Sequence, residues 1–309
     1  MRKMIVAGAL LLAVTAVPTG VALADPVPAA TTASRADQAA FVKTLRKQSG
    51  DVTIPAANAV LHLGAKYYFL GPDDAKKVLV DLWGNPPSSV SDVLGLVMPA
   101  DKSVMENSWG AVITWDDSGY VTDDDADSAD YDKIMADMKE GEGATNAERQ
   151  KAGYPAMSMV GWAQPPSYDK GTHSLIWARN FRIFGESADS LNYDVRLLGR
   201  KGVLSMNMLW DMPHLAEVRA AAQDFGKVAT FTSGSTYAEY NSGTDKAAGY
   251  GLAGLVGLGV GVAVAKKLGF LGLALVFGKK FFVLFAIAGA AIAGGFRKLF
   301  GRKKDTLES

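Results

Sequence analysis

The sequence has no cysteine and only three histidines among 309 residues. The missing cysteines exclude disulfide bonds, thiol catalysis and thiolate metal sites. None of His62, His173 and His214 has a neighbour at a metal-ligand spacing, so an imidazole-based metal centre is not expected. Net charge is absent as well, because 32 basic residues balance 32 acidic ones. That balance hides three pieces of different composition, and the sequence indicates architecture more directly than it indicates a reaction.

The N-terminus has the pattern of an export signal. A basic start, Met1 to Lys3, precedes the apolar run Met4–Val17, and Ala22-Leu23-Ala24 fits the small-x-small cleavage pattern. The alternative is an uncleaved N-terminal anchor, but the apolar run is shorter than the ~20 residues that a spanning helix needs. We therefore expect a signal peptide at residues 1–24 and a flexible N-terminus of the mature chain at 25–37.

Three uncharged apolar runs follow residue 246, and pairs of lysines separate them. The first run, 247–265, has 19 residues, and the third, 281–296, has 16. The middle run has 11 residues. As a helix it would measure about 16 Å, which is too short for a hydrocarbon core of about 30 Å. We expect a membrane anchor over 247–300, with transmembrane helices at about 247–265 and 281–296, and a basic tail at 301–309.

Small residues recur every four positions in these apolar runs. In lipid, a stripe of small residues lets two helix backbones approach closely, which predicts a packed helical hairpin or an oligomer. The alternative is that the stripe reflects only the high glycine content of membrane helices. The predicted helix-packing residues are Gly249, Ala253, Gly257, Gly261, Ala265, Ala286, Ala290 and Gly294.

The side of the membrane on which the tail lies is left open by the charges. An exported domain before residue 247 places Lys266 and Lys267 in the cytoplasm, in agreement with the positive-inside rule. If 281–296 also spans, the basic tail emerges outside, against that rule. If this run lies in the interface instead, all nine C-terminal positive charges stay inside. We favour two spans, because the third run is too apolar to lie in water.

The chain between the two apolar ends is acidic and predicts an exported domain. Residues 25–246 contain 21 Lys and Arg against 30 Asp and Glu, a net charge of −9, which argues against nucleic acid as a partner. Strand candidates with short turns between them are residues 155–164, 174–184, 192–198 and 203–210. The turn Gly199-Arg200-Lys201-Gly202 predicts a tight hairpin of the last two. Because short turns join antiparallel neighbours, we predict an α+β fold with a mainly antiparallel sheet and covering helices. The domain is expected at 38–232, followed by a linker at 233–246.

An acidic run in this domain resembles the start of a calcium loop. Asp123, Asp125 and Asp127 have the spacing that lets alternate carboxylates converge on one ion. The match then fails, because Ser128 stands where glycine is expected and Ile134 where a bidentate Glu belongs. We therefore interpret the run as a solvated loop before a helix, whose positive end favours acids. No metal and no cofactor is predicted.

No catalytic signature is present. The sequence has no GxSxG, SxxK, HExxH or Walker-type loop, and no catalytic residue is assigned. Asp211 with His214 stays open as an unfamiliar acid–base pair. His62 and His173 fall in strand candidates, where a histidine hydrogen-bonded within the sheet is the usual case. The six tryptophans are expected to pack in the core and sheet.

Several short strings resemble a bacterial family of uncharacterised membrane-anchored proteins, known only as a domain of unknown function. The strings are Asp81–Pro87, Ser108–Gly110, Gly161–Ala163, Leu191–Tyr193, Leu198–Leu204 and the anchor-like stretch Thr244–Lys267. The resemblance runs from about Asp51 to Arg302. It implies a signal peptide, an exported domain and C-terminal membrane helices, typically in Gram-negative bacteria. It supplies no activity and no ligand.

These observations favour a non-enzymatic protein of the bacterial envelope. The predicted function is an interaction or sensing module, held on the inner membrane with its main domain in the periplasm. The expected partners are the lipid bilayer and either a second copy or another envelope protein. Two alternatives stay open: an envelope enzyme, such as a hydrolase, with an unrecognised site, and a helix-packed membrane assembly.

Overall fold

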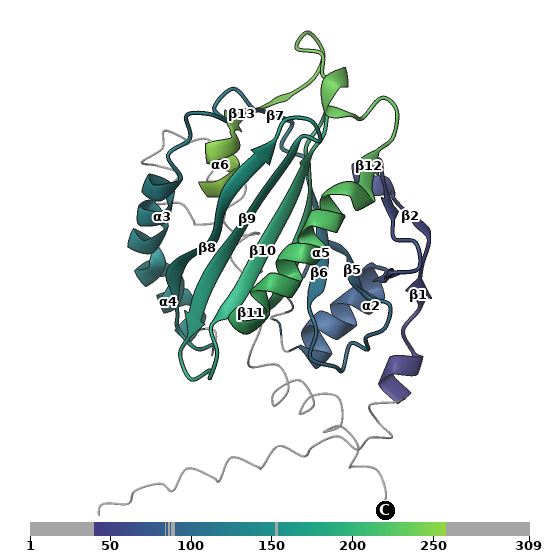
Figure 1. The fold of residues 1–309 in the computed structure, drawn as a ribbon, viewed down its shortest axis with the longest axis vertical. Helices are drawn as coiled ribbons and strands as arrows, with labels where there is room; N and C mark the ends of the chain where they lie inside the picture. Colours follow the sequence, from purple (N-terminus) through teal and green to yellow (C-terminus); the bar gives the residue numbers. More distant parts are fainter. Residues whose placement is uncertain (1–39, 84, 86, 88–89, 152–153, 258–309) are drawn as a thin grey trace, which may run out of the picture.

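The structure is a computed structural model that describes residues 40–83, 85, 87, 90–151 and 154–257 (Figure 1). Its strands are β1 (Lys47–Gln48), β2 (Asp51–Ile54), β3 (Ala59–His62), β4 (Tyr67–Leu70), β5 (Val93–Pro99), β6 (Gly110–Asp116), β7 (Tyr120–Thr122), β8 (Met157–Asp169), β9 (Ser174–Ile183), β10 (Ser190–Leu198), β11 (Val203–Asp211), β12 (Ala229–Phe231) and β13 (Ala247–Gly251). Its α-helices are α2 (Pro72–Lys77), α3 (Tyr131–Glu140), α4 (Glu142–Lys151), α5 (Leu215–Val228) and α6 (Leu252–Gly257). The short helices are η1 (Pro55–Ala57), η2 (Val78–Leu82), η4 (Met212–His214) and η5 (Tyr237–Glu239).

A large antiparallel sheet forms the centre of the fold. Its eight strands run in the order β1-β4-β5-β6-β11-β10-β9-β8, and every neighbouring pair is antiparallel. The predicted hairpin between β10 and β11 is confirmed, because Leu198 pairs with Val203 and the Gly199 N–H donates to Gly202 O at 2.8 Å. The α+β prediction with a mainly antiparallel sheet is therefore confirmed for the described residues.

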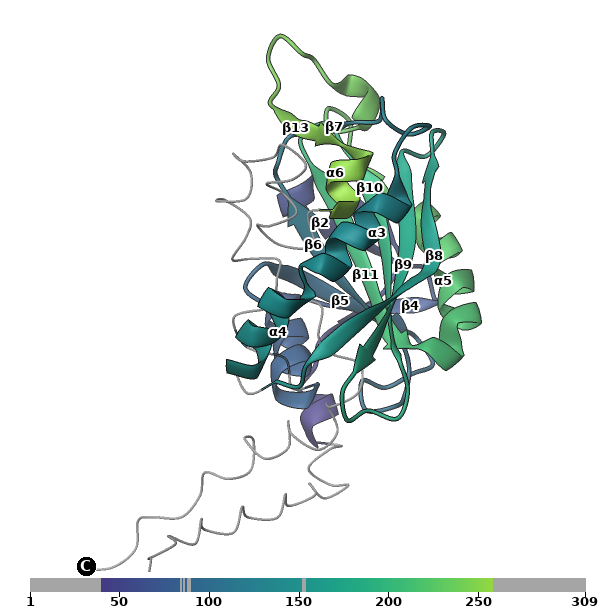
Figure 2. The same ribbon diagram turned by 90° about the vertical axis from the view of Figure 1, so that its left-hand side faces the viewer.

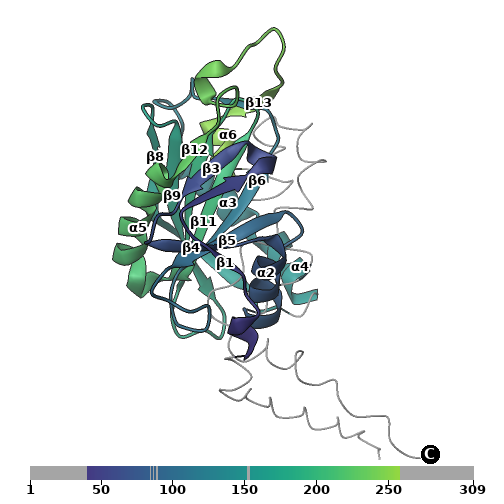
Figure 3. The same cartoon turned by 90° about the vertical axis from the view of Figure 1, so that its right-hand side faces the viewer.

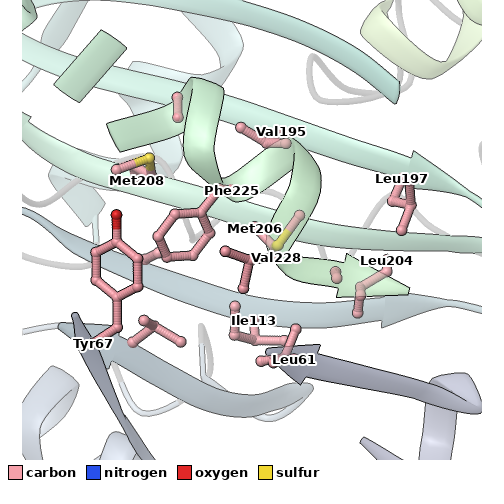
Figure 4. Close-up of a cluster of buried hydrophobic side chains, with 14 of the residues drawn as sticks. Leu61, Tyr67, Ile113, Val195, Leu197, Leu204, Met206, Met208, Phe225 and Val228 are labelled. Atoms are coloured by element: carbon pink, nitrogen blue, oxygen red, sulfur yellow. The ribbon is translucent and has the colours of Figure 1, made fainter. Parts of the chain in front are cut away.

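Helix α5 and a small sheet cover one face of the large sheet. Alternate side chains of β10 and β11, among them Val195 and Met206, point to this face because successive residues of a strand face opposite sides. Helix α5 buries Val218, Ala222 and Phe225, a spacing that places them on one side of a helix. Figure 4 shows Phe225 packed among these side chains. The three-stranded sheet β12-β3-β2 completes this core.

The opposite face carries two separate apolar clusters. Helices α3 and α6 cover the end formed by β8 and β9, with Met138 and Leu252 fully buried there. Helix α2 covers the end formed by β4 and β5, with Ala75 buried against Leu96. Figures 2 and 3 show α5 on one side of the sheet and α2 with α4 on the other. The middle of this face is polar, with Arg179, Asp194 and Arg196 buried there.

The structure corrects two boundaries expected from the sequence. The residues expected as a linker, 233–246, include η5, and the start of the expected first span, 247–265, forms β13 and α6. Strand β13 pairs in parallel with β7, and Tyr250 is buried with 4% of its surface exposed. Contacts from distant parts of the chain hold this segment, so its uncharged composition did not indicate its environment. The folded domain therefore continues to Gly257, the last described residue.

None of the helices in the described ranges is both long and apolar enough to cross a bilayer. The remainder of the expected first span and all of the second, at 281–296, lie outside the described residues. The expected signal peptide at 1–24, the expected flexible N-terminus at 25–37 and the expected basic tail at 301–309 also lie outside them.

Candidate functional site

The three histidines occupy three different environments. At the end of β3, both ring nitrogens of His62 are engaged, by Asp51 Oδ1 at 2.9 Å and by Thr230 Oγ1 at 2.9 Å. These contacts join β3 to β2 through Asp51 and to β12 through Thr230, so they connect all three strands of the small sheet. With both nitrogens bonded, the ring acts as a structural tie, in agreement with the interpretation as a sheet histidine.

His214 and Asp211 form the acid–base pair that the sequence left open. Asp211 ends β11 and His214 ends the short helix η4, which brings His214 Nδ1 into contact with Asp211 Oδ1. The imidazole stacks on the Trp210 indole, with ring centres 3.8 Å apart and planes 3° apart. Asn107 Oδ1 fixes that indole by accepting from its Nε1 at 2.8 Å. A carboxylate that binds Nδ1 leaves Nε2 as the base, which is the arrangement of general-base catalysis.

His173 lies in the turn between β8 and β9, outside the strands, which corrects the expectation that it belongs to a strand. Its φ of 51° is left-handed, a conformation that costs free energy for a residue other than glycine. Tyr168 Oη lies 2.9 Å from Asp123 Oδ2 and 3.1 Å from His173 Nδ1. The hydroxyl has one proton and donates it to the carboxylate, so Nδ1–H of His173 must donate to the hydroxyl oxygen. Neutral His173 therefore presents the lone pair on Nε2.

A stack of aromatic rings supports this chain of hydrogen bonds. Successive rings stack on one another, and the distances between their centres are 4.3 Å for His173 and Tyr237, 4.5 Å for Tyr237 and Tyr120, and 3.8 Å for Tyr120 and Tyr240. Burial raises the pKa of Tyr168, and the hydrogen bond to Asp123 raises it further. Tyr168 therefore stays protonated near neutral pH and continues to donate to Asp123. We name His173, Tyr168 and Asp123 the His–Tyr–Asp relay.

The acidic run flagged in the sequence does not converge on one point. Asp123 belongs to the relay, Asp127 pairs with Lys170 at 2.9 Å, and the Asp125 carboxylate accepts from two backbone N–H groups of α6. Asp130 caps α3 by accepting from Lys133 N at 2.9 Å. Among the residues described, no group of three His, Asp or Glu side chains is arranged to hold a metal ion.

Charged side chains occupy the polar middle of the sheet face. Asp194 is fully buried and contacts Arg179 Nη2 at 2.7 Å and Arg196 Nη2 at 2.9 Å. Burial alone would raise the pKa of Asp194, but the two guanidinium groups outweigh it and the pKa is lowered. Nearby, Asp116 accepts from the Tyr250 hydroxyl at 3.2 Å. Burial raises the pKa of Asp116, although Arg196 opposes that shift. These groups connect β6, β9, β10 and β13.

The strings that carry the family resemblance meet in packing contacts. The ring of Trp83 fills the space beside Gly110, where a side-chain carbon would lie. Arg200 and Asp245 form a two-contact ion pair, at 2.7 and 3.0 Å, which joins the β10–β11 turn to the segment before β13. Trp109, Trp177 and Trp210 are buried in the apolar clusters, where the sequence analysis places them. The roles that these contacts indicate are structural.

The predicted helix-packing residues fall into two groups. Gly249 lies in β13 with a φ of 78°, so it does not share a helical face with Ala253 and Gly257, which lie in α6. Gly249 therefore lies outside the predicted helical stripe, because it falls in the irregular part of the β7–β13 pairing and has a left-handed backbone. The other five residues lie outside the described chain: Gly261, Ala265, Ala286, Ala290 and Gly294.

Comparison with known proteins identifies the family of the chain. A family described as "Protein of unknown function (DUF2167)" matches residues 46–290. The chain belongs to this family. No curated protein matches the chain. Among solved structures, the solution structure of cyanobacterial PsbP (CyanoP) from Synechocystis sp. PCC 6803 is similar, with a TM-score of 0.34 and 10% sequence identity. That similarity covers 59% of this chain and 91% of the other, and at this score it supports no inference about function.

One of the two histidine sites, the pair of Asp211 and His214, could be predicted from the sequence. Asp211 and His214 are three residues apart, so their contact was a local possibility. The relay joins Asp123 to Tyr168, which is 45 residues away, and to His173 in a turn. No spacing rule connects these residues, and the acidic run around Asp123 was the one signal that pointed to the region.

Proposed function

We propose that the protein is a membrane-anchored module of the bacterial envelope whose exported domain senses or binds a partner and is coupled directly to its anchor. One observation carries the proposal: the residues at which the apolar C-terminal region begins are also the last strand and helix of the domain. Asp125 holds the start of α6, and Asp116 holds Tyr250 of β13. A change in the domain would therefore reach the chain that enters the membrane.

The fold also favours one membrane crossing over two. Because β13 and α6 use residues 247–257, only eight uncharged residues are left before Lys266. As a helix they would measure about 12 Å, against a hydrocarbon core of about 30 Å. The run at 281–296, extended by Leu299 and Phe300, reaches about 30 Å, with the intervening basic side chains extending toward the headgroups. We therefore place the single crossing at 281–300 in the inner membrane.

This topology agrees with the charges. With the domain in the periplasm and one crossing, Arg302, Lys303 and Lys304 lie in the cytoplasm, as the positive-inside rule favours. Those residues then face anionic headgroups, which attract basic segments. The lipid bilayer is thus the first partner in the proposal. With one crossing at 281–300, the helix-packing role falls to Ala286, Ala290 and Gly294, which would support self-association of that span.

Reporter fusions test the topology. Alkaline phosphatase, which is active only after export, is fused after Gly278 in one chain and after Ser309 in another, and green fluorescent protein is fused at the same positions. We expect phosphatase activity after Gly278 and fluorescence after Ser309. Phosphatase activity at both positions would show that the tail is outside and would overturn the single crossing.

A hydrolytic enzyme is the second candidate, and the Asp211–His214 contact is the observation that favours it. A histidine oriented by a carboxylate can take a proton from water that attacks an ester carbonyl. If the pair is catalytic, the full chain hydrolyses p-nitrophenyl acetate, and His214→Gln and Asp211→Asn both lose this activity. His62→Gln is the matched control, because His62 lies in the small sheet. Equal rates in all four proteins would exclude the second candidate.

A further inference from the structure

The turn between β8 and β9 is joined to the loop that holds the start of α6. We name residues 123–130 the acidic loop. Tyr168 donates to Asp123 at 2.9 Å, and Lys170 pairs with Asp127 at 2.9 Å. Because both contacts lie within a few residues of His173, the position of the acidic loop depends on the region around that histidine.

The same loop fixes the first residues of α6. Asp125 Oδ1 accepts from Leu252 N at 2.8 Å, and Oδ2 accepts from Ala253 N at 2.9 Å. These are N–H groups at the start of a helix that have no partner within the helix itself. The Asp125 carboxylate also fills the space beside Gly251, the residue before α6. A movement of the loop would therefore displace the backbone at the start of α6. Asp123 and Asp125 are two residues apart and therefore move together.

The charges around His173 are mostly negative. Asp169 ends β8, next to the turn that contains His173. The pKa of its carboxyl is lowered, chiefly by the N–H groups of Gly171 and Thr172 and to a smaller extent by His173. Tyr168 faces the imidazole from β8 and Tyr237 stacks on it from η5. Asp123 lies behind Tyr168, and Lys170 is the cation of this turn, already paired with Asp127.

We propose that His173 is a proton sensor, and that a proton on its Nε2 strengthens the hold of the acidic loop on the start of α6. This inference rests on the coupling of domain and anchor in the proposed function. Imidazole is the side chain that ordinarily changes charge between pH 5 and pH 8. No described residue bonds to Nε2, so the proton has an open position.

The direction of the effect follows from the relay. A charged imidazolium makes Nδ1–H a stronger donor to the Tyr168 hydroxyl, and the polarised hydroxyl then donates more strongly to Asp123. The added positive charge also offsets the repulsion among the carboxylates of the acidic loop. Acid should therefore tighten the loop against α6, and neutral pH should loosen it.

Hydrogen exchange in the full chain, reconstituted in lipid nanodiscs, tests this inference. The measured quantity is the protection factor of the Leu252 and Ala253 amides, which is corrected for the pH dependence of intrinsic exchange. We expect it to rise about fivefold from pH 7.5 to pH 5.5, since charge-assisted hydrogen bonds are roughly twice as strong as neutral ones. The amides of β10 serve as the internal reference for global stability.

Three variants separate the relay from other causes. His173→Asn, which tolerates a left-handed backbone, and Tyr168→Phe should both remove the rise, whereas His62→Asn should retain it. A wild-type protein without the rise, or a rise that persists in His173→Asn, overturns the inference. The reporter fusions above do not depend on pH. If the fusions place the tail in the cytoplasm but the protection factor does not change with pH, only the proton sensor is refuted. If the fusions place the tail outside but the protection factor does change with pH, only the proposed topology is refuted.

Discussion

The hairpin of β10 and β11 is held by contacts between residues close in sequence, whereas the C-terminal segment 233–257 is held by contacts with distant residues. In the hairpin, partners are close in sequence, as in the pair Leu198 and Val203 across a short turn. In the C-terminal segment, Tyr250 bonds to Asp116, which is 134 residues away, and Leu252 N bonds to Asp125, which is 127 residues away. Local pairing follows from alternation and turn residues, whereas distant pairing depends on the whole fold.

The two regions also meet. Arg200 in the turn of the hairpin pairs with Asp245 in the C-terminal segment. The hairpin, which forms from neighbouring residues, therefore helps to hold the C-terminal segment in place. A uniform uncharged run can therefore belong to a folded domain when the rest of the chain places a partner strand, here β7, beside it. The following predictions test how much each region depends on the other.

The largest effect should come from removing β13 and α6. A chain of residues 25–246 loses the burial of Tyr250, Leu252, Leu255 and Val256, whereas a chain of residues 25–257 retains it. Burying such a side chain is worth about 1.5–3 kcal/mol each, and whole domains are stable by about 5–15 kcal/mol. We expect the shorter chain to be largely unfolded at 25 °C by circular dichroism and the longer chain to unfold cooperatively. Equal melting curves would show that the segment is dispensable to the fold.

A smaller effect, centred on the hairpin, should follow Asp194→Ala. This change leaves the buried Arg179 and Arg196 without their common carboxylate and should cost about 3–5 kcal/mol. Urea unfolding gives the free energy. The control is Asp189→Ala, which removes a pair with the exposed Arg182 and should cost less than about 1 kcal/mol. Similar losses in the two variants would contradict the role assigned to burial.

Tyr250→Phe tests the contact between β13 and the sheet. It removes the hydroxyl that donates to buried Asp116 and should cost about 1–2 kcal/mol in urea unfolding. Tyr131→Phe is the matched control, because the Tyr131 hydroxyl is buried with no partner among the described residues. We expect the control to keep its stability, and a larger loss in Tyr131→Phe than in Tyr250→Phe would refute this account of β13.

The smallest effect concerns the ion pair that joins the two regions. Hydrogen bonds from Arg200 lower the pKa of Asp245 to about 2. A carboxyl whose pKa is lower in the folded than in the unfolded protein stabilises the fold above its unfolded pKa, near 4, and loses that contribution as pH falls through the folded value. The melting temperatures of wild type and Asp245→Asn should therefore differ from pH 7 down to about 4 and converge toward pH 2.

Arg200→Gln should give the same pH profile as Asp245→Asn, since each removes one partner of the pair. A constant difference down to pH 2 would mean that the contribution of Asp245 does not depend on the charge of its carboxylate, and it would contradict this account of the ion pair.

The strands of the large sheet could largely be predicted from the sequence, because alternation and turn residues act locally. The short strand β7 and helix α4 could not. Helix α4 has a polar sequence and is held partly by Asn146, whose amide bonds to both backbone groups of Met157. These two hydrogen bonds satisfy backbone groups at the unpaired edge of β8, so they depend on where that edge lies in the folded structure. No feature of the α4 sequence alone indicates that this segment forms a helix against β8.

The sequence by itself determined the α+β class of the domain, the β10–β11 hairpin and the proximity of Asp211 to His214, since each rests on neighbours along the chain. Only the tertiary structure decided that residues 247–257 belong to the domain and which residues form the relay of His173, Tyr168 and Asp123. The physical reason is the environment of the segment 247–257. Its uncharged side chains are equally suited to lipid and to a protein core, and the choice depends on whether β7, Asp116 and Asp125 are placed to receive it.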